Sequence, residues 1–201
     1  MNSQSRKRRT KKENMDIIKR VAFQLLKEKG YVNLSINDIA DMSSINISQV
    51  YRYFPNGKPD IFLSLGVDFF ETSAPKLESI DLNRPREFLY SLVMSLINTH
   101  RANRLILQVL KIVFLSYPEL LKGDKDLFRL SLSEFKYFDT LVEQLGVVEP
   151  QKRVATTQFV FHLVDSMIHR HILETDVAET DEVLAHLLSN IVVKHIDSIA
   201  K

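Results

Sequence analysis

Residues 35–54 read SINDIADMSSINISQVYRYF, and this stretch decides the fold of the first quarter of the chain. Ser35 can cap a helix, and Asp38 follows three residues later in the spacing of a capping box. The serines at 43–44 end that short helix, and Asn46 can cap the next one. The residues predicted to face inward from the two helices are Ile36, Ile39, Ala40, Val50 and Phe54.

A longer helix precedes these two. Apolar residues recur at helical spacing between Ile17 and Leu26, which predicts a helix from about Lys12 to Lys29 that Gly30 ends. A long helix followed by two short helices with a tight turn between them is a helix-turn-helix. This unit places its second short helix in the major groove of DNA.

The rest of the chain is predicted to be helical, which makes the fold class all-α. Gly (5) and Pro (6) are too scarce for an all-β fold, and Pro85 and Pro150 stand where the first turn of a helix accepts proline. We expect Asn83 to cap the helix that contains Pro85, and Gly146 to end another. Gly66 falls inside a helix, where close packing or a bend would explain it. The predicted helices span residues 58–79, 84–101, 103–116, 125–145, 150–173 and 180–199.

Charge divides the chain as well. The first 58 residues hold 12 of the 27 basic residues but only 5 of the 25 acidic ones, so they carry +7 against −5 for the remainder. The basic run at 6–12 is either a solubilising tail or an arm that lies on DNA phosphates or in the minor groove. We therefore expect a basic flexible arm at 1–12, a helix-turn-helix DNA-binding domain at 13–57, and a helical ligand-binding and dimerisation domain at 58–201.

The composition excludes several classes of protein. The chain has no cysteine, and therefore no disulfide, thiolate metal site or cysteine nucleophile. No apolar stretch reaches the roughly 18 residues that a membrane helix needs, and no signal-peptide core follows the basic start. A cytoplasmic protein without a membrane partner is expected. The sequence also lacks a glycine-rich phosphate loop, an HExxH pair and a nucleophile elbow, so we expect no enzymatic activity.

Several motifs occur together in an order that resembles the TetR family of transcriptional regulators. They are Gly30-Tyr31, the segment from Ser35 to Ala40, the segment from Val50 to Pro55, and Gly57-Lys58. The resemblance covers about residues 14–63, and it implies a three-helix DNA-binding domain, a helical body and a regulator that is usually a repressor. One departure concerns the turn, where Ser43-Ser44-Ile45-Asn46 replaces the family's Ala-Gly-Val-Ser and the glycine is lost.

Contacts with double-stranded DNA are predicted for the exposed face of the helix that begins after Asn46. Gln49 suits a bidentate bond to adenine and Ile47 suits the methyl group of thymine, while two tyrosines and a lysine suit phosphates. The alternative for Tyr51 and Tyr53 is packing within the small domain. The complete predicted set is Arg6, Lys7, Arg8, Arg9, Ser35, Asn46, Ile47, Ser48, Gln49, Tyr51, Arg52, Tyr53 and Lys58.

The last two predicted helices are apolar over a wider arc than one core contact needs, which indicates a partner subunit. The residues predicted at a homodimer interface are Phe161, Ile168, Leu184, Leu187, Leu188, Ile191 and His195. The alternative is burial in a monomer core. The TetR resemblance implies that these helices form the dimer and set two recognition helices about one DNA turn apart, so that the operator is a near-palindrome.

The middle helices carry many aromatic side chains, which form either plain core or, as the resemblance implies, a cavity for a small-molecule effector. The expected ligand is bulky and apolar, with an anionic group near Arg101 or Arg104. The residues predicted to line the cavity are Phe70, Met94, Arg104, Phe138 and His162. Asp165 and His169 share a helix face, but the sequence shows no third ligand, so no metal site and no cofactor are predicted.

The expected function is therefore a dimeric DNA-binding regulator, a repressor that a small apolar ligand releases from its operator. The alternative is an interaction module whose basic arm binds RNA or an anionic surface without recognising a duplex sequence. The two differ in specificity, because binding to phosphates alone is lost steeply with salt and shows no sequence preference.

Overall fold

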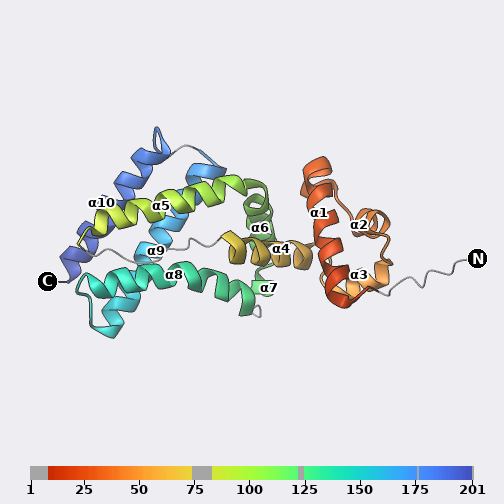
Figure 1. Ribbon diagram of the computed structural model, residues 1–201, viewed down its shortest axis with the longest axis horizontal. Helices are drawn as coiled ribbons and strands as arrows, with labels where there is room; N and C mark the ends of the chain where they lie inside the picture. The colour runs from red at the N-terminus through yellow and green to blue at the C-terminus, as the bar shows by residue number, and fades with distance from the viewer. Residues whose placement is uncertain (1–8, 74–82, 122–124, 176, 201) are drawn as a thin grey trace, which may run out of the picture. The chain divides into compact units, whose positions relative to one another are not determined.

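The computed structural model describes residues 9–73, 83–121, 125–175 and 177–200, and all regular elements in these ranges are helices (Figure 1). This confirms the all-α fold. Contacts divide the chain into two compact units. Unit 1 comprises Met1–Asp68 and Val109–Lys122, and unit 2 comprises Phe69–Gln108 and Gly123–Lys201. No helix in the described ranges combines the length and the apolar composition needed to cross a membrane.

Unit 1 begins with the three helices of the predicted helix-turn-helix. They are α1 (Lys11–Asn33), α2 (Ile36–Ser43) and α3 (Ile47–Tyr53). A capping box opens α1, because the Thr10 hydroxyl accepts from the Glu13 amide at 3.2 Å and the Glu13 carboxylate accepts from the Thr10 amide at 2.6 Å. Gly30 breaks the helical geometry with φ of 74°, as predicted, but the helix resumes for one further turn to Asn33.

The core of the helix-turn-helix follows the predicted pattern with one exception. Ile39, Ala40, Val50 and Phe54 are buried, whereas Ile36 is only partly buried. The remainder of unit 1 consists of the first part of α4 (Lys58–Ser73), the last part of α6 (Arg104–Ser116), and α7 (Pro118–Leu121), a short helix that the sequence did not indicate. The compact unit is therefore larger than the domain expected at residues 13–57.

Gly66 allows α4 and α6 to approach closely within unit 1. A Cβ at this position would lie 2.8 Å from Cδ1 of Leu110, which is closer than carbon atoms can come without a shift. The structure therefore supports close packing as the reason for a glycine inside this helix.

Unit 2 is built from longer helices. They are α5 (Pro85–Ala102), the first part of α6, α8 (Lys125–Gln144), α9 (Pro150–Leu173) and α10 (Asp181–Ile199). Helix α5 packs on α9 and α10, and α8 packs on α9. The boundaries of these helices agree with the sequence prediction to within two residues. For the helix that begins at residue 58, the predicted end at residue 79 falls outside the described residues. The cap predicted at Asn83 is wrong, because Arg84 holds that position.

The core of unit 2 accounts for much of the apolar surface predicted to meet a partner. Phe161, Ile168, Leu184 and Leu188 are at most 8% exposed and pack against α5 and α8 residues. This corrects the prediction that these four side chains face a second subunit. The sequence could not distinguish these residues from the exposed apolar residues of the same helices. A wide apolar arc indicates that a helix contacts both a core and another surface, but it does not show which residue lies in which contact.

Candidate nucleic-acid interface

Helix α3 buries one side and exposes the residues predicted to read DNA on the other. Val50 is fully buried, while Ile47 is 43% and Tyr51 is 47% exposed. Ser48 and Arg52 are also exposed, and Gln49, Tyr53 and Lys58 are partly buried. A short helix with hydroxyl, amide, guanidinium and apolar groups on its outer side has the chemistry for base edges and phosphates in the major groove.

The turn that holds α3 in place uses a strained residue. Ser44 adopts a left-handed conformation, with φ of 54° and ψ of 38°, and its amide donates to the carbonyls of Ala40 and Asp41. Ile45, buried beside it, donates to the Ala40 carbonyl at 3.1 Å. This is the position at which the sequence lacks the glycine of the related pattern, so serine carries a backbone strain that glycine would avoid.

The start of α3 is less fixed than predicted. Asn46 occupies the N-cap position, but its side chain makes no capping hydrogen bond. Its carbonyl accepts from the amides of Gln49 and Val50 at 2.8 and 3.1 Å. The Asn46 side chain is exposed, which is compatible with the DNA contact predicted for it.

Tyr53 lies at the end of α3 and links it to α1. Its hydroxyl accepts from the side-chain amide of Asn14 and from the Arg52 guanidinium, both at 3.3 Å. The guanidinium also lies 5.2 Å from the centroid of the Tyr53 ring. These hydrogen bonds, with that from Asn14 the larger cause, lower the pKa of Tyr53. The contact with Asn14 was not foreseen, since the two residues are 39 positions apart.

Tyr51 is supported by the turn that follows α3. Gly57 has φ of 68°, and a Cβ there would lie 3.3 Å from Cε1 of Tyr51 and 3.5 Å from Ile36. Only glycine combines this backbone conformation with a close approach to the tyrosine ring. Tyr51 thus packs along one edge and remains half exposed on the other.

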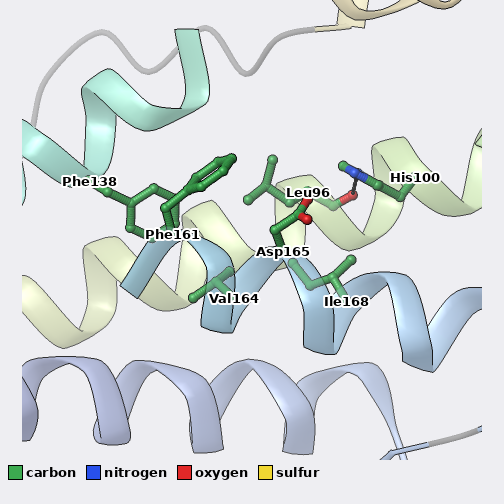
Figure 2. A pocket seen from close by; sticks show the side chains of 7 residues that line it. All are labelled: Leu96, His100, Phe138, Phe161, Val164, Asp165 and Ile168. Atoms are coloured by element: carbon green, nitrogen blue, oxygen red, sulfur yellow. Dashed lines mark hydrogen bonds between the residues drawn. The ribbon is translucent and has the colours of Figure 1, made fainter. Parts of the chain in front are cut away.

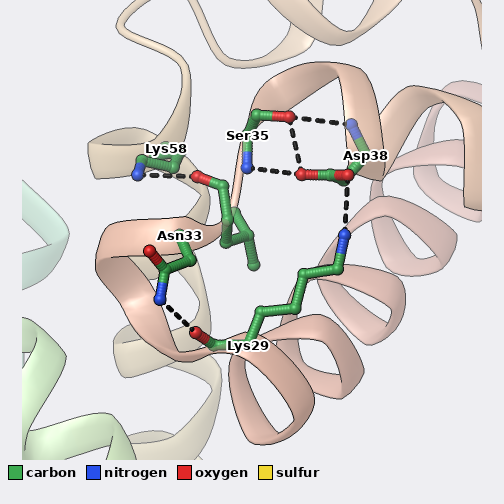
Figure 3. Close-up of polar contacts among 6 residues, drawn as sticks. Lys29, Asn33, Ser35, Asp38 and Lys58 are labelled. Carbon is green, nitrogen blue, oxygen red and sulfur yellow. Dashed lines mark hydrogen bonds and ion pairs between the residues drawn. The ribbon is translucent and has the colours of Figure 1, made fainter.

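Ser35 and Asp38 form the predicted capping box of α2, shown in Figure 3. The Ser35 hydroxyl accepts from the Asp38 amide at 3.1 Å, and the carboxylate accepts from the Ser35 amide at 2.9 Å. Lys29 adds an ion pair at 2.8 Å. The Lys29 bond, followed by those from Ser35, holds the pKa of Asp38 far below its usual range. Ser35 is exposed but already donates its hydroxyl to Asp38 at 2.7 Å.

Lys58 is placed differently from the other predicted phosphate contacts. Its ammonium donates to the backbone carbonyls of Tyr31 and Leu34, at 2.9 and 2.8 Å, and lies 4.5 Å from the Tyr31 ring centroid (Figure 3 shows one of these bonds). Desolvation lowers the pKa of Lys58. Two of its three N–H groups therefore join α4 to the end of α1, and a phosphate would have to use the third.

The basic arm is described only in part. Arg9 is exposed and precedes Thr10, the N-cap residue of α1. Arg6, Lys7 and Arg8 lie outside the described residues. The arm therefore stays a prediction from charge.

Part of the sequence of unit 1 matches a known protein family. Residues 18–65 match the model of the bacterial regulatory proteins of the TetR family. These residues therefore form a domain of the TetR-family type. The matched segment runs from within α1 into α4 and includes all of α2 and α3, so it contains the turn at Ser44 and every predicted DNA contact beyond the arm.

Solved structures extend the similarity in fold beyond this TetR-family domain. A TetR-family protein from Rhodococcus RHA1 covers 92% of this chain and 97% of its own at 15% identity, with a TM-score of 0.59. The fatty acid degradation regulator FadR from Bacillus halodurans covers 93% and 97% at 18% identity, with a TM-score of 0.61. A TetR-family protein from Mesorhizobium loti covers 96% and 98% at 15% identity, with a TM-score of 0.60. No curated protein sequence matches this chain significantly.

In unit 2, α9 and α10 leave an apolar surface exposed. Leu187 and Ile191, two of the predicted interface residues, are each 49% exposed. Phe159 on α9 is 51% exposed and its ring lies 4.6 Å from that of His195 on α10. Val154 and Val183 are exposed on the same helices. We call these six residues the α9–α10 apolar surface; Phe159, Val154 and Val183 were not among the interface residues predicted from the sequence.

The residues predicted for an effector cavity are not gathered at one place. Phe138 is buried and lines a narrow pocket with Leu96, Phe161 and others (Figure 2), but the space between them is too small for a water molecule. Met94 packs against the core, Arg104 is exposed, and His162 lines a shallow groove along α9. The side chain of Phe70 lies outside the described residues. Arg101 forms an ion pair with Asp181.

Proposed function

We propose that the protein binds a near-palindromic DNA duplex as a homodimer through α3, and represses transcription until a small apolar effector releases it. The observation that carries the proposal is the outer face of α3, where Ile47 and Arg52 are exposed and Gln49 is partly exposed, while Val50 on the inner side is fully buried. Such a helix fits the major groove and offers donors, acceptors and a methyl contact to base edges.

The homodimer in this proposal is supported by the α9–α10 apolar surface. Exposed apolar residues concentrated on two adjacent helices are costly in water and typical of an interface between subunits. Leu187, Ile191 and His195 remain as interface candidates, and Phe159, Val154 and Val183 join them. A twofold axis would place the same surface of each copy against the other.

Release by an effector would require unit 2 to open. The pocket around Phe138 and Phe161 is too narrow for a water molecule, so a bulky ligand enters only if side chains separate. Helix α4 belongs to unit 1 up to Asp68 and to unit 2 from Phe69, so it joins the two by continuous backbone. An effector that shifts α4 would change the presentation of α3 to DNA. A DNA-bound regulator acts where the chromosome is, which is the cytoplasmic location expected from the sequence.

The second candidate function is binding of RNA or an anionic surface by the basic arm. The +7 charge of the first 58 residues favours it as a source of affinity. Binding through the arm does not depend on which side chains α3 exposes. The two functions can therefore be distinguished by substitutions in α3, which change the DNA sequence that is bound only if α3 contacts the bases.

Selection of bound sequences from a random duplex pool tests the proposal. We expect an enriched near-palindrome, and fluorescence anisotropy should show that Gln49→Ala and Arg52→Ala each weaken its binding by about 10- to 100-fold, since a bidentate base contact contributes roughly 1–3 kcal/mol. Arg86→Ala, which removes an exposed arginine from α5 in unit 2, is the matched control and should bind as the wild type does.

A different outcome of the selection and binding experiments would reject sequence-specific DNA binding. An unenriched pool, together with equal binding to duplex, single strands and anionic vesicles that disappears with salt, would establish the second function and reject the first.

A further inference from the structure

Three side chains with metal-binding atoms converge inside unit 2. His100 comes from the end of α5, and Asp165 and His169 come from one face of α9. One ligand atom from each lies within 4.8 Å of the others. The sequence showed the pair on α9 but not His100, which is 65 positions before Asp165 and reaches it only because α5 packs on α9 (Figure 2 shows His100 and Asp165).

Hydrogen bonds orient both imidazoles. Nδ1 of His100 lies 2.8 Å from the Leu96 carbonyl oxygen, and Nδ1 of His169 lies 3.0 Å from the Asp165 carbonyl oxygen. A carbonyl can only accept, so each ring donates through Nδ1, and Nδ1 of His169 also lies 3.1 Å from Oδ1 of Asp165. A histidine that ligates a metal commonly donates its other N–H to a backbone carbonyl in this way, which fixes the tautomer and the ring plane.

The three residues differ in their exposure to solvent. His100 is 2% exposed, whereas the side chains of His169 and Asp165 are 30% and 32% exposed. Ligand atoms around a tetrahedral zinc-type ion stand about 3.4 Å apart, given metal–ligand distances of about 2.0–2.1 Å. The present spacing reaches up to 4.8 Å, so metal binding would require the partly exposed Asp165 carboxylate to move towards the two imidazoles.

The geometry points to a binding site for one zinc-type divalent transition-metal ion between α5 and α9, held by His100, Asp165 and His169. Two imidazoles and one carboxylate suit Zn²⁺, Co²⁺ or Ni²⁺ better than Mg²⁺ or Ca²⁺, which prefer oxygen ligands. Three protein ligands leave a fourth position for water or an anionic donor. The bound ion would join α5 to α9, beside the narrow pocket that His100 and Asp165 also line.

The test is a titration of the untagged full-length protein, freed of metal by a chelator, with Co²⁺ followed by its visible absorption and with Zn²⁺ by calorimetry. We expect one ion per chain. His169→Gln and Asp165→Asn should each weaken binding by at least about tenfold, which is the loss seen even for residues that only orient a ligand. Both side chains are partly exposed, so these variants should keep the wild-type melting temperature without metal.

Two further histidines provide matched controls. His162→Gln on α9 and His186→Gln on α10 change exposed residues of the same unit and should leave the affinity and stoichiometry unchanged. The site would be overturned by any of three results: no bound ion, unchanged binding in His169→Gln and Asp165→Asn, or loss of binding in His162→Gln or His186→Gln. The titration contains no DNA, so its outcome is independent of the proposed function.

Discussion

The two units stabilise their helices in different ways. In unit 1 the helices are mostly short, and polar side chains hold their ends: Thr10 caps α1, Ser35 and Asp38 cap α2, and Lys58 bonds the carbonyls where α1 finishes. In unit 2 the helices are long and bury an extensive apolar core, yet α9 and α10 still leave Leu187 and Ile191 half exposed.

This difference follows from helix length. A helix of seven or eight residues has unsatisfied groups at both ends and little area to bury, so end bonds matter greatly to it. A helix of about 20 residues has enough surface for a core on one side and a partner on the other. Substitutions in unit 2's apolar surface should therefore change assembly, and substitutions at the helix ends of unit 1 should change folding.

The largest effect is expected at the α9–α10 apolar surface. Replacing both Leu187 and Ile191 by Glu would bury charges in the proposed interface, and we expect the homodimer dissociation constant to rise by on the order of 1,000-fold or more. Sedimentation velocity across a concentration series measures this. Val148→Glu, at a residue that is 72% exposed after α8, should leave the assembly unchanged. A double variant that stays dimeric would place the interface elsewhere.

The next effect concerns Lys58. Lys58→Met leaves the carbonyls of Tyr31 and Leu34 without this donor, so the free energy of unfolding in urea should fall by about 2–3 kcal/mol. Lys12→Met, at an exposed lysine of α1, should change it little. If stability is kept while the salt dependence of DNA binding becomes shallower, Lys58 serves DNA phosphates and not the fold.

A smaller effect is expected at the turn between α2 and α3. Ser44→Gly should raise the free energy of unfolding by about 0.5–1 kcal/mol, because glycine adopts the left-handed conformation without strain while adding some unfolded-state entropy. Ser44→Val should lower it, since a β-branched residue tolerates this conformation poorly. Thermal and urea denaturation compare the three proteins. Equal stability of all three would mean that the turn stores no strain.

The smallest effect is expected at Asp38, because this carboxylate is partly exposed to solvent. Its pKa is lowered in the folded state, first by Lys29 and then by Ser35, so its contribution to stability is present above the usual carboxyl pKa and is lost as the pH falls. Asp38→Asn should therefore be less stable than the wild type at pH 7, and the difference should shrink towards pH 3. Asp41→Asn on the same helix is the control. A difference independent of pH would contradict the ionic origin.

The sequence alone determined the helices and the recognition motif, because both depend on local chemistry. Helical periodicity, the capping residues Thr10, Ser35 and Thr180, and the prolines at the starts of α5 and α9 act within a few positions of each other. Of these caps only Ser35 was named in advance, although Thr10 and Thr180 carry the same signal. The order of motifs from Gly30 to Lys58 was likewise readable from the chain, and the family match bears it out.

Three features were decided only by the tertiary structure. They are which apolar residues face a core, which lysine donates hydrogen bonds to backbone carbonyls, and which potential metal ligands lie close together. Leu184 and Leu187 look alike in the sequence, yet one is buried and the other half exposed. Lys58 bonds carbonyls 24 and 27 positions away, and His100 reaches α9 across the packing of two helices. These features arise from contacts between segments distant in the chain, and periodicity along one helix carries no information about what lies opposite it.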